Sequence, residues 1–67
     1  MLQLAKSWLD DQHERGAKRI GVTFYHCMVR IWADDRKREF TVATPDEARQ
    51  LRDALHDHIG GMKAEER

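Results

Sequence analysis

The sequence contains a single cysteine, Cys27, among its 67 residues. An internal disulfide is therefore excluded, and one free thiol without a recognisable signal peptide favours an intracellular, cytoplasmic protein. No apolar run approaches the roughly 18 residues that a membrane span needs. Basic and acidic residues number twelve each, so no net charge draws the chain towards nucleic acid or a membrane.

The chain is also short of large apolar side chains. Hydrophobic residues make up 40% of the sequence, and seven of them are alanines. A single domain spanning residues 1–67 buries a smaller fraction of its surface than a larger domain does. Because no disulfide adds stability, and because a short sheet has edge strands that must be paired or protected, we expect a homodimer.

Helices are predicted at both ends of the sequence. Over about 2–15, apolar residues and Gln12 recur at helical spacing, and Gly16 follows as a C-cap. Residues 44–47 read Thr-Pro-Asp-Glu, a capping box that begins a second helix over about 45–59. The pair Gly60-Gly61 is expected to end this helix and to leave a charged tail at 62–67.

The segment between the helices, about 18–43, is rich in β-branched and aromatic residues and predicts strands. The one clear reversal is a hairpin loop at 34–37, which would pair Val29 with Val42 and Ile31 with Phe40. Apolar residues occupy even positions from 20 to 24 but odd positions at 29 and 31. This change of phase requires either a bulge or a tight turn between them, and the absence of turn-forming residues at 25–27 favours a bulged strand.

These patterns predict an α+β fold: a helix, a two- or three-stranded antiparallel sheet and a second helix, with both helices on one sheet face. The expected core residues are Trp8, Leu9, Val29, Ile31, Phe40, Val42, Leu51, Leu55 and Ile59.

Candidate metal ligands are few and poorly spaced. His56 and His58 are two residues apart on a helix and cannot chelate one ion, and His26 and Cys27 would point to opposite faces of a strand. A site that combines Cys27 with a helical histidine is left open, but Cys27 is expected to be a small core residue. We expect no metal, no cofactor, no catalytic residues and no enzyme activity.

The charge is unevenly distributed. Residues 17–43 contain six basic and three acidic residues, a net charge of +3, with three of the basic residues at 36–38. Trp32 is predicted on the sheet face that points away from the core, although packing beside Trp8 is the alternative. Trp, Met and Arg are enriched at interfaces. The predicted partner-binding residues are Met28, Arg30, Trp32, Arg36, Lys37 and Arg38.

The leading functional prediction is a non-enzymatic protein-binding module, an inhibitor or adaptor that acts on a protein or a nucleoprotein complex. The alternatives are a nucleic-acid-binding protein that uses the basic hairpin, and a structural subunit of a larger assembly. In size and organisation the chain is similar to small phage and mobile-element regulators directed at host defence or regulatory machinery. That similarity implies a regulatory role and assigns no residues.

Overall fold

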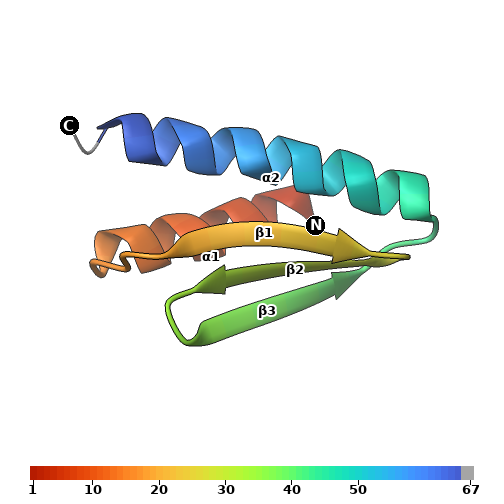
Figure 1. Cartoon of the computed structure of the whole chain (residues 1–67), viewed down its shortest axis with the longest axis horizontal. Coiled ribbons are helices and arrows are strands. Elements are labelled where there is room, and N and C mark those ends of the chain that lie inside the picture. The colour runs from red at the N-terminus through yellow and green to blue at the C-terminus, as the bar shows by residue number, and fades with distance from the viewer. Residues whose placement is uncertain (66–67) are drawn as a thin grey trace.

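The chain forms α1 (Leu2–Glu14), β1 (Ile20–Tyr25), β2 (Met28–Ala33), β3 (Arg36–Thr41) and α2 (Pro45–Glu65) (Figure 1). The computed structural model describes residues 1–65, with side chains described to Met62. The strands make one antiparallel sheet in the order β1-β2-β3. Both helices pack on the same sheet face, α2 mainly over β1 and α1 over β2, and they also contact each other. The predicted α+β fold is therefore confirmed.

Two-residue turns join the strands. His26 and Cys27 connect β1 to β2, so the predicted bulged strand is wrong and the turn accounts for the change of phase. His26 has φ 53° and Asp34, the first residue of the second turn, has φ 56°. Histidine and aspartate enter this left-handed region more often than most non-glycine residues. The first turn thus forms without the turn residues whose absence favoured a bulged strand.

The second turn is also shorter than predicted: it consists of residues 34–35, and the expected loop at 34–37 is wrong. Asp34 explains this position, because its carboxylate accepts hydrogen bonds from the main-chain N–H groups of Lys18 (3.2 Å) and Arg19 (3.0 Å). Its own N–H donates to the carbonyl of Arg19 (2.7 Å). These bonds hold the turn against the start of β1.

The shorter loop shifts the pairing of β2 with β3 by two residues from the predicted register. Val29 lies opposite Phe40, and Ile31 lies opposite Arg38. A shift of two keeps every side chain on its predicted face, because side chains alternate with period two. The shift also leaves β3 with only one apolar residue facing the helices, and five of its six residues are exposed.

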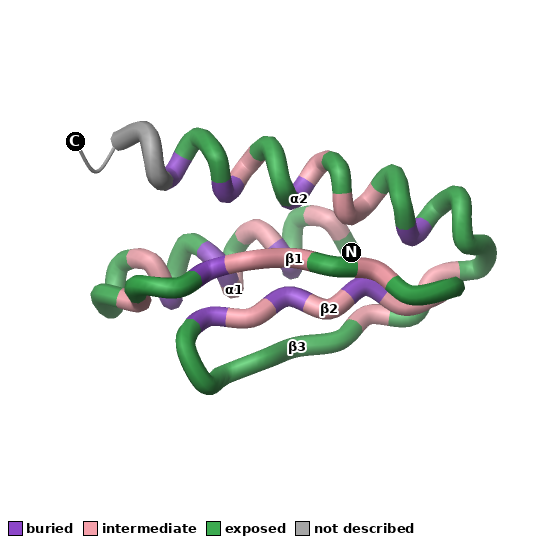
Figure 2. The backbone as a smooth tube through the Cα atoms, in the orientation of Figure 1, coloured by how far each residue is buried: buried purple, intermediate pink, exposed green. Residues whose placement is uncertain are grey.

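The core lies between the helices and the central strand, where buried positions of α1, β2 and α2 face one another (Figure 2). Leu9, Val29, Ile31 and Leu55 are the largest fully buried side chains. All nine predicted core residues belong to this core or pack against it. Trp8 is among the partly buried residues at its margin.

The N-terminus of α2 is capped by Thr44, whose hydroxyl accepts the N–H of Glu47 (3.1 Å). The Glu47 carboxylate accepts the N–H of Ala43 (3.3 Å), one residue before the position of a capping box. The expected helix end at Gly60-Gly61 is wrong, since both glycines lie inside α2. Met62 is buried and continues the apolar stripe beyond them. Of the expected tail at 62–67, residues 66 and 67 lie outside the described residues.

Candidate functional site

The sheet has one face without a helix, here called the open face. Along β2, Val29, Ile31 and Ala33 point towards the helices and are buried, whereas the alternate residues are half-buried. Because α1 and α2 both pack on the first side, the second side remains accessible to a partner. The residues of the open face are Gly21, Thr23, Tyr25, Met28, Arg30, Trp32, Lys37, Glu39 and Thr41.

Trp32 lies across the neighbouring strand with its indole ring over Gly21. A Cβ atom added to Gly21 would come within 2.2 Å of Cζ2 of Trp32. Gly21 and Trp32 are direct partners in the β1–β2 register. Because glycine has no side chain, the indole ring can pack directly on the backbone of β1. Trp32 is therefore half-buried by its own sheet, neither in the core nor free in solvent.

Arg30 and Glu39 form an ion pair on the open face. Nε and Nη2 of Arg30 donate to the same oxygen, Oε2 of Glu39, at 2.9 and 2.6 Å. The pKa of Glu39 is lowered, first by this hydrogen bonding and then by the positive charges of Arg30 and Lys37. The pair neutralises the centre of the face and leaves Lys37 as its remaining cation.

A hollow of about 310 Å³ opens beside this pair and is lined by Thr23, Phe24, Tyr25, Met28 and Arg30. Tyr25 is 69% exposed. Its ring meets that of His26 edge to face, with centroids 4.2 Å apart. The flexible Met28 and the exposed Tyr25 give this end of the open face an apolar character.

The predicted binding residues divide between the two faces. Met28, Arg30, Trp32 and Lys37 lie together on the open face as expected. Arg36 and Arg38 do not join them, because even-numbered residues of β3 point to the helix side. There, Nη1 of Arg36 donates to Oε1 of Gln12 on α1 (3.3 Å). The Arg38 guanidinium lies 5.7 Å from the centre of the Phe40 ring.

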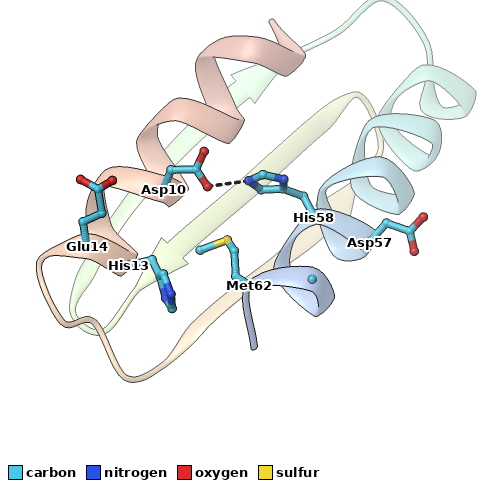
Figure 3. Close-up of a pocket in the computed structure, with 7 residues that line it drawn as sticks. Asp10, His13, Glu14, Asp57, His58 and Met62 are labelled. Atoms are coloured by element: carbon cyan, nitrogen blue, oxygen red, sulfur yellow. Dashed lines mark hydrogen bonds and ion pairs between the residues drawn. The ribbon is translucent and has the colours of Figure 1, made fainter. Parts of the chain in front are cut away.

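A second hollow, of about 480 Å³, lies between the helices (Figure 3). Nε2 of His58 lies 2.7 Å from Oδ1 of Asp10 and joins α2 to α1. Asp57 lines the same hollow but points away from this pair (Figure 3). Within the described residues, no group of three His, Cys, Asp or Glu side chains is placed to hold a metal ion. Sequence reasoning missed the Asp10–His58 pair, since nothing local links residues 48 positions apart.

Cys27 differs from its predicted surroundings. It lies in the β1–β2 turn, is half-buried, and places Sγ 3.8 Å from the carbonyl oxygen of Ala43. The expectation of a core residue on a strand is therefore wrong.

None of the described helices combines the length and the apolar character needed to cross a membrane. Comparison with protein-family models, with curated proteins and with solved structures finds no match to this chain.

Proposed function

We propose that this chain is a non-enzymatic protein-binding module, an inhibitor or adaptor that docks a protein partner on its open face. The supporting observation is that both helices cover one side of the sheet, so that Tyr25, Met28 and Trp32 lie on the uncovered side. Aromatic residues, methionine and arginine are enriched where protein interfaces concentrate their binding energy. The free thiol of Cys27 favours a cytoplasmic setting for this interaction.

The contact of Trp32 with Gly21 suits a role in binding a protein partner. The indole ring is held against Gly21 before any partner arrives, so binding orders little of this side chain. A contact that is already in place avoids the entropy cost of immobilising a rotamer, about 0.5–1.5 kcal/mol for a side chain.

The area and charge of the open face indicate what kind of partner it can bind. Three strands of six residues present roughly 300 Å², well below the ~800 Å² that each side of a standard interface buries. A partner that binds tightly must therefore extend over the turns as well. With Arg30 paired to Glu39, the exposed Lys37 gives the face a positive edge, which favours an acidic partner surface.

The test compares Trp32→Ala with Leu4→Ala in binding to a partner isolated from the native host. Leu4 is 68% exposed on α1 and serves as the matched control. Trp32→Ala is expected to stay folded by circular dichroism and to weaken binding by about 2 kcal/mol or more. Leu4→Ala is expected to bind as the parent does. Equal binding by both variants, or unfolding of Trp32→Ala, would remove the open face as the site.

The second candidate is nucleic-acid binding at the β2–β3 turn. The Asp34 carboxylate brings the exposed Lys18 and Arg19 beside the turn that leads into Arg36 and Lys37. These cations form a basic end that could bind phosphates, although Asp34 and the adjacent Asp35 reduce its charge.

A salt titration distinguishes the two functions. Binding of a labelled single-stranded oligonucleotide should weaken steeply with salt and be lost in the double variant Lys18→Glu with Arg19→Glu, both exposed at the basic end. Binding of a protein partner through Trp32 should respond little to salt. A salt-sensitive oligonucleotide complex that Trp32→Ala leaves unchanged would favour the second candidate.

A further inference from the structure

The two edge strands of the sheet, β1 and β3, differ in their charged residues. Along β3, residues 36–39 are all charged, which protects an edge strand against pairing with another chain. The opposite edge is β1, Ile20–Tyr25, which contains no charged residue and no proline. It therefore lacks the charged side chains that protect β3.

The outward main-chain groups of this edge have no hydrogen-bond partner within residues 1–65. The bond from the Asp34 N–H to the Arg19 carbonyl shows that Arg19 faces β2. Because hydrogen-bonding direction alternates along a strand, the N–H and C=O groups of Ile20, Val22 and Phe24 point away from β2. Within residues 1–65, no main-chain bond from another element reaches them.

A groove borders one end of β1, and the large Phe24 side chain lies at the other end. The groove, of about 310 Å³, runs along this strand between Gly21 and Trp32 on the open side and His56 and Gly60 of α2 on the other. At the far end of β1, the Phe24 ring projects beneath the Arg52 guanidinium, 4.9 Å from the ring centre. Val22 borders the groove, and Phe24 follows it on the same face of β1.

Gly60 supports a role for this groove. A Cβ atom added there, or at Gly61, would meet nothing within 4 Å, so packing within the described chain requires neither glycine; of the two, Gly60 borders the groove. Glycine weakens a helix interior relative to alanine. A residue without a side chain does, however, allow a second chain to approach α2 closely.

We propose that a second copy of this chain pairs with β1, antiparallel, about a twofold axis through Val22. In this register, Ile20 lies opposite Phe24 of the second copy, and Val22 lies opposite its own equivalent. The Phe24 side chain of each copy then enters the groove of the other, and the outward N–H and C=O groups are paired. The two sheets become one sheet of six strands.

Charge and area are consistent with this occupant. The strand brings no charge to the contact, and Nε of Arg52 already lies 2.7 Å from Oδ1 of Asp53. β1 with the adjoining side of α2 offers roughly 400 Å² per copy, about half of the ~800 Å² of a standard interface. We therefore expect a weak, concentration-dependent dimer with a dissociation constant in the micromolar range or above.

The test measures mass and amide exchange together. Light scattering from about 10 μM to about 1 mM should show a rise towards twice the chain mass. Over the same range, the amides of Val22 and Phe24 should become protected from hydrogen exchange. The amides of Lys37 and Glu39, which point outwards at the other edge, should exchange rapidly throughout. A monomer at about 1 mM, or a dimer in which Val22 and Phe24 stay unprotected, would overturn the proposal.

Paired glycine variants test the groove. Gly60→Leu should raise the dissociation constant of the dimer at least about tenfold. Gly61→Leu is the matched control, because Gly61 lines the hollow between the helices instead. Equal effects of the two variants would count against the groove.

A cross-link tests the register if Gly60→Leu fails to fold. In a Cys27→Ser background, Val22→Cys should give a covalent dimer with a short thiol-to-thiol cross-linker, since hydrogen-bonded partners have Cα atoms ~5.5 Å apart. Glu39→Cys, at the other edge, should not. Failure of Val22→Cys to cross-link would overturn the register. Trp32 borders both the open face and the groove, so dimer formation by Trp32→Ala is measured beside its partner binding. Loss of partner binding with an unchanged dissociation constant of the dimer leaves the proposal standing.

Discussion

At the scale of single residues, the open face depends on the contact between Gly21 and Trp32, which neither residue indicates by itself. The sequence predicted the face on which Trp32 lies, because side chains of a strand alternate strictly. It could not predict that Gly21 lies beneath the ring, since cross-strand partners depend on the turn at residues 26–27. Arg36 and Arg38 were grouped with Trp32 because they are close in sequence, although their parity puts them on the opposite face.

Gly21→Ala should destabilise the fold by about 1–3 kcal/mol, because the new methyl group collides with the indole of Trp32. The same substitution made in a Trp32→Ala background should cost much less. Urea unfolding of the two single variants and the double variant gives the coupling free energy directly. Strict additivity would show that the ring does not rest on Gly21.

The Arg30–Glu39 pair gives a pH-dependent prediction. Since folding lowers the pKa of Glu39 from its usual 4.5, the pair stabilises the fold above that pH. This contribution is lost as the pH falls through the lower, folded-state pKa. Arg30→Met should return the pKa of Glu39 towards its usual value in a carboxyl NMR titration. An unchanged pKa would assign the shift to another neighbour.

At the scale of elements, helix positions were readable from the sequence and strand connections were not. The apolar spacing of α1 and the cap of α2 are local signals, and both helices start where predicted. The second reversal was predicted but made two residues too long, because Asp34 is held by contacts with Lys18 and Arg19, sixteen and fifteen residues away. The first turn was the less favoured of two alternatives. The end of α2 was misplaced because burial of Met62 outweighs two local glycines.

Asp34→Ala should destabilise the protein by about 1–3 kcal/mol. It removes the acceptor for two main-chain N–H groups and places a residue less tolerant of positive φ at 56°. Asp35→Ala in the same turn should change stability by less than about 0.5 kcal/mol. Chemical denaturation of both variants checks the difference, and equal losses would mean that Asp34 does not hold the turn.

At the scale of the whole molecule, stability rests on a small core. A domain of this length has a free energy of unfolding of roughly 3–10 kcal/mol. Only four large side chains among the described residues are fully buried, and they come from α1, β2 and α2. The predicted core was correct because it depended only on which face of each helix or strand carries the apolar residues. The Asp10–His58 contact could not be predicted in this way, because it depends on how the two helices pack in the folded chain.

Leu55→Ala should therefore cost about 3 kcal/mol or more, a large share of the total, because Leu55 is fully buried. Leu4→Ala, at an exposed position of α1, should cost less than about 0.5 kcal/mol. Thermal melting of both variants at one protein concentration provides the comparison. Similar melting temperatures would show that the core is not centred on Leu55.

The two short turns also bear on how fast the chain folds. Partners in the β1–β2 hairpin are separated by three residues, as in Tyr25 and Met28, to thirteen, as in Ile20 and Ala33. Hairpins with such short loops close within about 1–10 μs, whereas Asp10 and His58 must bridge 48 positions. Pairing of the strands therefore requires only short loop closures, whereas the contact between α1 and α2 requires the longest one. Contacts of short sequence separation favour fast folding, so the two hairpins offset the cost of bringing the two helices together.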